Sequence, residues 1–300
     1  MKSIYIDLNK VDEYANFAST IPGGANFDVN ERDSLTYVAA ERVYMRGEID
    51  EARNSFTHYL QTFPEGAFSL NANYYVGLID YNRKAYNSAI EHLDKVLAYP
   101  NNKYSEDAMM MSAEMAYSAK DYEKALTVYK QLKDKAVSPE RRQLAKTGVL
   151  RSAYMLGNGE EDLLAETKVA PELSNEAHYY RAKAYLDAGK VEGAMDDLKI
   201  LAKDTRNIYG AEAKYKVAQI YFDAGQTEQA EKEVLDYIEV STPHTYWLAR
   251  SFVLLSDVYM KLGRNLDAKQ YLLSLKQNYQ ADDDIAGMIE SRLNKLNAEN

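Results

Sequence analysis

The chain has 300 residues, with 36 basic and 46 acidic side chains, a formal net charge of −10 and no cysteine. This acidic balance argues against nucleic acid as a partner, because a phosphate backbone would be repelled. The lack of cysteine excludes disulfides, thiolate metal ligands and a cysteine nucleophile, and no apolar run reaches the roughly 18 residues of a membrane-spanning helix.

A small residue recurs along the chain at a nearly constant interval. The recurring residues are Ala52, Ala89, Ala125, Ala194, Ala230 and Ala268. They lie 37, 36, 69, 36 and 38 residues apart, and 69 spans two periods. A fixed period of this size is typical of a stacked repeat array. Apolar residues at i, i+3, i+4 and i+7 within each period predict two amphipathic helices joined by a short turn, and therefore an all-α fold.

The front of the chain is predicted to be an incomplete unit. The segment starting at Asn9 aligns with the segment starting at Gly47, so residues 1–20 hold the end of one helix, a turn and a second helix. By this alignment Met1 falls inside a helix whose start is missing. We therefore expect the chain to be a fragment of a longer protein.

About seven helical hairpins are predicted to follow. Their ranges are 34–64, 71–100, 104–135, 139–169, 175–203, 210–239 and 245–278, with a capping helix at 284–297. The unit at 139–169 is degenerate, because its short second helix, starting at Glu160, lacks the alanine. The expected turn residues are Gly47, Lys84, Lys120, Gly189, Gly225 and Gly263. Glycine suits such a turn, because positive φ closes the first helix at its C-cap.

At this point the repeated residues resemble the tetratricopeptide repeat (TPR). The family pattern places a small residue, then Tyr, then Gly, then Ala, an aromatic or large apolar residue and finally Pro, and the first full unit matches it with Val43 at the Tyr position. The matching residues are Ala40, Val43, Gly47, Ala52, Phe56, Tyr59 and Pro64. The resemblance covers nearly the whole chain and implies one right-handed TPR superhelix, an α-α solenoid, over residues 1–300.

A narrower resemblance concerns the spacing of Phe56, Tyr59, Phe63 and Pro64, followed by the Tyr-rich segment 72–77. This sequence pattern is similar to that of Gram-negative cell-envelope TPR proteins, including large Bacteroidetes ones. It implies a periplasmic or outer-membrane-associated protein that associates with an outer-membrane complex through a missing N-terminal part. A cytoplasmic location is the alternative.

The TPR resemblance also implies a concave groove lined by the first helix of each hairpin. The expected groove residues are Tyr37, Glu41, Tyr44, Tyr74, Tyr81, Glu114, Tyr117, Tyr179, Lys183, Tyr215, Gln219, Phe222, Asp257 and Met260. Tyrosine provides a large rigid contact area at low entropic cost, which suits recognition. Packing between neighbouring repeats is the alternative role for each tyrosine. The carboxylates among these residues favour a basic or neutral partner.

We therefore expect a non-catalytic scaffold that holds a peptide segment or a partner subunit in the groove. Two alternatives remain open, a glycan- or peptidoglycan-binding module and a self-associating structural array. No cofactor, metal or catalytic residue is predicted. His58, His92, His178 and His244 are scattered without ligand spacing, and residues 282–284 lack the alternation of a calcium loop.

Overall fold

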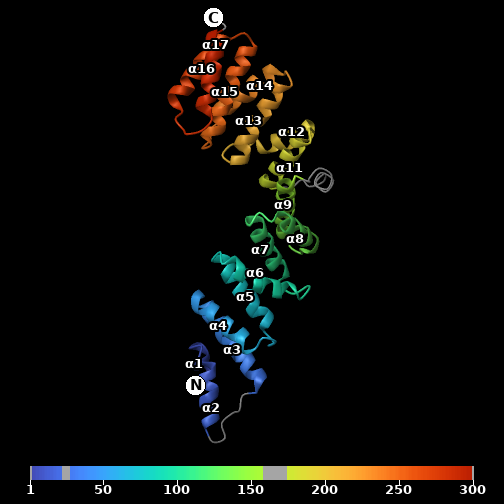
Figure 1. Ribbon diagram of the computed structural model, residues 1–300, viewed down its shortest axis with the longest axis vertical. Coiled ribbons are helices and arrows are strands. Elements are labelled where there is room, and N and C mark those ends of the chain that lie inside the picture. Colours follow the sequence, from blue (N-terminus) through green and yellow to red (C-terminus); the bar gives the residue numbers. More distant parts are fainter. Residues whose placement is uncertain (1, 22–27, 158–173, 299–300) are drawn as a thin grey trace. The chain divides into compact units, whose positions relative to one another are not determined.

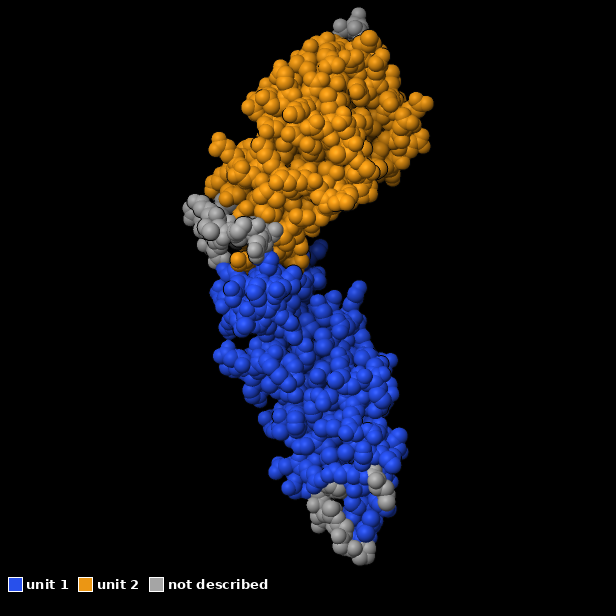
Figure 2. All heavy atoms as spheres, turned by 180° about the vertical axis from the view of Figure 1, so that it is seen from behind, with its two compact units in different colours: residues 1–145 blue, residues 146–300 orange. Residues whose placement is uncertain are grey.

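The computed structural model describes residues 2–21, 28–157 and 174–298. These residues form sixteen helices and no strand. Contacts divide the chain into two compact units, residues 1–145 and residues 146–300, which Figure 2 shows in blue and orange. Each unit is described by itself below. The described helices confirm the predicted all-α hairpin fold, whereas a single superhelix over residues 1–300 stays a prediction.

Unit 1 begins with α1 (Lys2–Asp7) and α2 (Val11–Thr20), followed by three helical hairpins (Figure 1). The hairpins are α3 (Val29–Met45) with α4 (Ile49–Thr62), α5 (Ser69–Asn82) with α6 (Tyr86–Leu97), and α7 (Ser105–Ser118) with α8 (Tyr122–Lys135). Helix α3 starts before the predicted residue 34, because the Asp28 carboxylate caps it by accepting a hydrogen bond from Glu31 N at 2.7 Å. The next helix, α9 (Pro139–Leu156), starts in unit 1 and ends in unit 2.

Unit 2 continues with three further hairpins and a last single helix (Figure 1). These are α11 (Asn175–Asp187) with α12 (Val191–Leu201), α13 (Ile208–Asp223) with α14 (Thr227–Ile238), α15 (Thr245–Lys261) with α16 (Asn265–Asn278), and α17 (Ile285–Ala298). We call the first helix of each hairpin, and α9, an A helix, and the second a B helix. The second helix expected for the degenerate repeat, near residue 160, lies outside the described residues.

The recurring alanines lie where the helices pack most closely. Ala52, Ala89, Ala125, Ala194, Ala230 and Ala268 are all fully buried on the B helices. A larger side chain would force the A and B helices apart, because protein cores tolerate added volume poorly. The repeat period seen in the sequence is therefore the period of helix contact.

Each A helix ends in the same turn. In the six hairpins the residue after the C-cap of the A helix has positive φ, at Gly47 (80°), Lys84 (61°), Lys120 (63°), Gly189 (70°), Gly225 (75°) and Gly263 (74°), and α9 is followed directly by Gly157 (67°). In the first hairpin Gly47 N bonds Tyr44 O at 2.9 Å and Glu48 N bonds Val43 O at 3.3 Å, which is a Schellman motif. The predicted turn positions are thus confirmed, including the two held by lysine.

Candidate interaction face of the A helices

The fourteen residues predicted to line a groove occupy only three positions of the A helix. Counted back from the positive-φ residue of the turn, these are positions −10, −6 and −3. Position −10 holds Tyr37, Tyr74, Tyr179 and Tyr215; position −6 holds Glu41, Glu114, Lys183, Gln219 and Asp257; position −3 holds Tyr44, Tyr81, Tyr117, Phe222 and Met260. Spacings of four and three residues place these positions on one side of a helix. We call this side the A face.

The tyrosines at position −10 hydrogen-bond to the next A helix of the same unit. In all four cases the partner is the residue at position −13 of that helix. The bonds run from Asn71 Nδ2 to Tyr37 Oη at 3.3 Å, from Tyr74 Oη to Asp107 Oδ2 at 3.1 Å, from Tyr179 Oη to Glu212 Oε2 at 3.0 Å, and from Arg250 Nη2 to Tyr215 Oη at 3.5 Å. These hydroxyls therefore connect consecutive hairpins.

The rings at position −10 are also largely covered. Tyr37 is 3% exposed and Tyr215 is 6% exposed. Tyr37 stacks on Phe68 with a centroid distance of 4.5 Å, and Tyr74 stacks on Tyr104 at 4.0 Å. Burial raises the pKa of Tyr37 well above its usual range, so its hydroxyl stays protonated and can donate. Tyr37 and Tyr215 thus offer a partner no open ring face.

In unit 1 the carboxylates at position −6 are oriented by tyrosine hydroxyls. Tyr37 Oη donates to Glu41 Oε1 at 2.9 Å, and Tyr129 Oη donates to Glu114 Oε1 at 2.7 Å. Both glutamates are partly exposed. Each carboxylate is therefore held in place before any partner arrives.

In unit 2 the side chains at position −6 make different contacts. Lys183 Nζ lies 5.1 Å from the centroids of both the Tyr154 and the Tyr179 ring. Gln219 Oε1 accepts from Tyr215 Oη at 2.9 Å. The carboxylate of Asp257 is bound by Arg292 of α17, with Nε to Oδ1 at 2.8 Å and Nη2 to Oδ2 at 2.7 Å.

The residues at position −3 are partly exposed in both units. Their ring contacts are Tyr44 with Tyr75 at 4.8 Å, Tyr81 with Tyr86 at 6.3 Å, Tyr117 with Tyr122 at 5.3 Å, and Phe222 with Lys261 Nζ at 5.1 Å. Met260 packs against the core cluster around α15. Of the three positions, −3 leaves the most aromatic surface accessible in unit 1.

The sequence reasoning missed the partners at position −13, namely Asn71, Asp107, Glu212 and Arg250. The signal was a polar residue at position −13 of the following A helix, 33 to 35 residues after each tyrosine at position −10. It also missed the aromatic surroundings of Arg250, whose Cζ lies 5.2 Å from the Tyr215 ring, 5.7 Å from the Tyr246 ring and 6.0 Å from the Trp247 ring. Helix periodicity cannot predict such contacts between hairpins, because it gives only the positions of side chains around a single helix axis.

Comparison with protein-family models matches residues 107–136 to the tetratricopeptide repeat. This segment is most of α7 and all of α8, and the other described hairpins repeat its alanine and its turn. The α7–α8 hairpin therefore matches the TPR model directly, and the other described hairpins share its helical pattern. No curated protein matches it in sequence.

Two solved structures illustrate the likeness. A tetratricopeptide repeat protein from Parabacteroides merdae aligns with a TM-score of 0.49 and 15% identity, over 87% of this chain and 98% of that chain. PilF of Pseudomonas aeruginosa aligns with a TM-score of 0.36 and 13% identity, over 89% of this chain and 97% of that chain.

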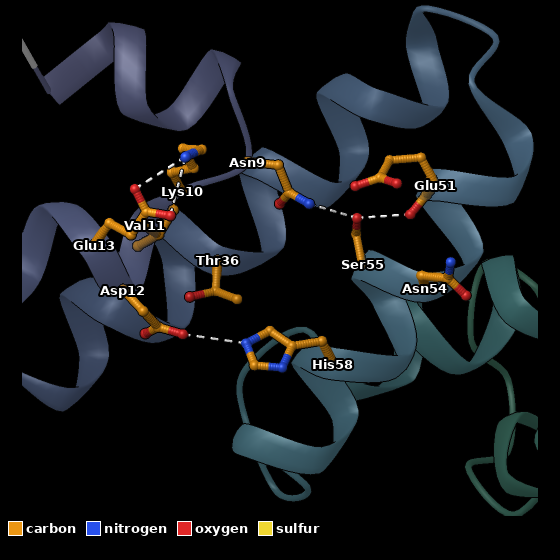
Figure 3. Close-up of a pocket in the computed structure, with 10 residues that line it drawn as sticks. All are labelled: Asn9, Lys10, Val11, Asp12, Glu13, Thr36, Glu51, Asn54, Ser55 and His58. Carbon is orange, nitrogen blue, oxygen red and sulfur yellow. Dashed lines mark hydrogen bonds and ion pairs between the residues drawn. The ribbon is translucent and has the colours of Figure 1, made fainter.

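A polar pocket of about 330 Å³ lies beside the α3–α4 hairpin, away from the A-face positions (Figure 3). Across it, His58 Nε2 lies 3.2 Å from Asp12 Oδ2, and Asn9 Nδ2 donates to Ser55 Oγ at 2.7 Å. Burial opposes ionisation of Asp12, but the bonds from Arg32 and His58 outweigh it and lower the pKa of Asp12. These contacts tie α2 to α4.

Two features are absent from the described part of the chain. Within it, no three His, Cys, Asp or Glu side chains are grouped so that they could hold a metal ion. None of its helices combines the length and the apolar character needed to cross a bilayer.

Proposed function

We propose that this protein is a non-catalytic scaffold whose A face in unit 1 binds a segment of a partner protein. The TPR fold supports a role in protein interaction in general. The observation that carries the finer proposal is the orientation of Glu41 and Glu114 by tyrosine hydroxyls, beside the partly exposed Tyr44 and Tyr117. Carboxylates fixed before binding lose little entropy on binding and suit a basic or neutral segment.

A crosslinking pull-down with the native chain as bait tests this proposal. The variant Tyr44→Ala/Tyr81→Ala/Tyr117→Ala removes aromatic surface at position −3. The control Val240→Ala/Leu266→Ala/Leu273→Ala removes three exposed apolar side chains elsewhere. We expect the native chain and the control to capture the same partner and the tyrosine variant to lose it, with helicity unchanged by circular dichroism. Equal capture by all three would place the interface elsewhere.

Charge reversal separates a peptide ligand from a glycan. A basic peptide needs the carboxylates, so Glu41→Lys and Glu114→Lys should weaken its binding. A glycan needs ring faces, so Tyr→Phe should be tolerated where Tyr→Ala is not. Stacking of Tyr37 on Phe68 and of Tyr74 on Tyr104 already uses two of the ring faces that a sugar would need, which favours the peptide.

Self-association is the second candidate, because α1 and α2 carry exposed apolar side chains. Ile4 is 59% exposed and Leu8 is 60% exposed, and Phe17 and Ile21 are exposed as well. Sedimentation at increasing concentration, with Ile4→Lys/Leu8→Lys as the comparison, tests this candidate. A mass that stays monomeric at all concentrations would rule it out.

The proposed setting is a Gram-negative cell-envelope assembly, and it rests on the sequence resemblance of the segment 56–77. Running the pull-down separately on envelope and cytosolic fractions tests it. Capture of the partner only from the cytosolic fraction would contradict an envelope role.

A further inference from the structure

A second pocket, with a volume of about 300 Å³, lies between the α6–α7 loop and α8 in unit 1. Leu97, Met109 and Val128 line it with apolar side chains, and Met109 is itself buried. These three residues belong to the small hydrophobic cluster around Leu132. We call this pocket the anchor pocket; none of the fourteen A-face candidates lines it.

The anchor pocket lies at a pair of positions that recurs in every described hairpin. In each hairpin, position −11 of the A helix faces position +8 of the B helix, counted from the turn residue. Four hairpins join this pair directly: Asn73 with His92 at 2.8 Å, His178 with Asp197 at 2.7 Å, Lys214 with Glu233 at 2.5 Å, and Phe252 with Tyr271 at a ring distance of 6.0 Å.

In α7 and α8 the pair is Met109 and Val128, which have no polar atom to form such a bond. In α3 and α4 it is Thr36 and Ser55, and there the polar pocket of Figure 3 is found. These two pockets therefore lie where this pair carries no bonding or aromatic contact. The anchor pocket is the apolar one of the two.

Both walls of the anchor pocket are held by hydrogen bonds. Asn102 fixes the α6–α7 loop, because its Nδ2 donates to Val96 O at 2.9 Å and to Tyr99 O at 2.6 Å. On the other side, Glu106 Oε1 accepts from Val137 N at 2.8 Å. A pocket with fixed walls can accept a side chain at a low ordering cost.

Two lysines of α8 lie at or beside the opening of the anchor pocket: Lys135 lines it, and Lys124 lies one helical turn before Val128. Glu106, which also lines the pocket, is paired with Arg141 Nε at 3.7 Å. Lys124, Val128, Gln131 and Lys135 are spaced along one side of α8. Both lysines are exposed, and neither lies within ion-pair distance of a carboxylate among the described residues. Val137, which also lines the pocket, is 84% exposed. An apolar floor beneath unpaired cations fits an apolar side chain with acidic neighbours.

We propose that the anchor pocket binds one large apolar side chain of an acidic partner segment. Lys124 and Lys135 contact carboxylates on either side of that side chain, and Val137 covers it. This surface is separate from the A face, so the chain can hold a second segment while the A face is occupied. The proposal does not depend on the function proposed for the A face.

Methionine methyl NMR tests the proposal on the whole chain. The probe is a blocked peptide with one leucine flanked on both sides by glutamates. Two control probes replace the leucine by alanine or the glutamates by lysines. We expect the Met109 methyl signal to shift and saturate with the first probe, while that of Met45, exposed on α3, stays in place. Loss of the leucine side chain should weaken binding by about tenfold.

Two variants complete the experiment. Gln131→Trp fills the pocket opening from an exposed position, and Lys124→Glu/Lys135→Glu reverses the charge at the opening. Each should weaken binding by about tenfold, whereas the control Lys190→Glu/Lys232→Glu, exposed in unit 2, should not. The proposal is overturned if the Met109 methyl signal shows no saturable shift with the leucine–glutamate peptide. It is also overturned if the control probes bind the native chain equally well, or if the two variants bind that peptide as tightly as the native chain does.

Discussion

Arg53 on α4 binds both carboxylate oxygens of Asp80 on α5, with Nε to Oδ1 at 2.5 Å and Nη2 to Oδ2 at 2.9 Å. The Asp80 side chain is 1% exposed, and Ser88 Oγ also donates to it at 2.6 Å. The bond joins the B helix of one hairpin to the A helix of the next. A buried carboxylate needs such a partner, because an unpaired charge in the core is strongly destabilising.

We therefore predict that Arg53→Met lowers the free energy of unfolding of unit 1 by about 3–5 kcal/mol. The matched control is Arg83→Met, because Arg83 pairs with Asp50, whose side chain is 91% exposed. Exposed pairs contribute about 0–1 kcal/mol, so the control should change little. Urea unfolding followed by circular dichroism measures both. Equal effects of the two substitutions would contradict a special role for the buried pair.

A second prediction concerns acid stability and Asp197 in unit 2. Asp197 is fully buried and accepts from Arg181 Nε and Nη2, both at 2.6 Å, and pairs with His178 Nδ1 at 2.7 Å. Burial opposes ionisation, but the bonds from Arg181 and His178 outweigh it and lower the pKa of Asp197 below its ordinary value of 3.8.

A lowered folded-state pKa means that the unfolded chain binds the proton more tightly. The stability contribution of Asp197 is therefore complete above pH 3.8 and is lost as the pH falls through the lower, folded-state pKa. Urea unfolding of unit 2 between neutral pH and about pH 2 measures this loss, and Asp197→Asn should remove part of the slope. An unchanged slope in the variant would show that other carboxylates account for the acid sensitivity.

The third prediction concerns the two turns in which lysine occupies the positive-φ position. Lys84 and Lys120 have φ of 61° and 63°, which costs a side-chain-bearing residue about 1 kcal/mol relative to glycine. Lys84→Gly and Lys120→Gly should each raise the free energy of unfolding by about 0.5–1 kcal/mol. Gly47→Ala should lower it by a similar amount, although a Cβ at Gly47 would meet no atom within 4 Å. Chemical denaturation of the three variants decides this, and destabilised lysine-to-glycine variants would refute it.

The fourth prediction distinguishes positions −10 and −3 of the A face. Tyr37→Phe removes a hydroxyl that bonds both Glu41 and Asn71. The free energy of unfolding should fall by about 1 kcal/mol, because two partners lose a partly buried hydrogen bond. Tyr44→Phe is the control, since Tyr44 forms no side-chain hydrogen bond among the described residues. Thermal and urea unfolding of both variants provide the measurement, and equal stability would mean that the cross-hairpin bonds contribute nothing.

Local features of the sequence were sufficient to predict the repeat, the helices and the turns. The buried alanine of each unit and the positive-φ residue after each A helix depend on one hairpin only. Even the lysines at Lys84 and Lys120 could be placed in the turns, because the period marks the position whatever residue occupies it. Helical spacing likewise places the A-face candidates on one side of each A helix, and their role in binding stays a prediction.

Tertiary structure decided how those candidates are used. Tyr74 bonds Asp107, Tyr179 bonds Glu212, and both partners lie 33 residues further along the chain. The anchor pocket likewise depends on Met109 and Val128 meeting across a hairpin. Periodicity places side chains around a single helix axis. Which of them touch depends on how neighbouring helices stack and which rotamers they leave room for, and these are properties of the packed chain.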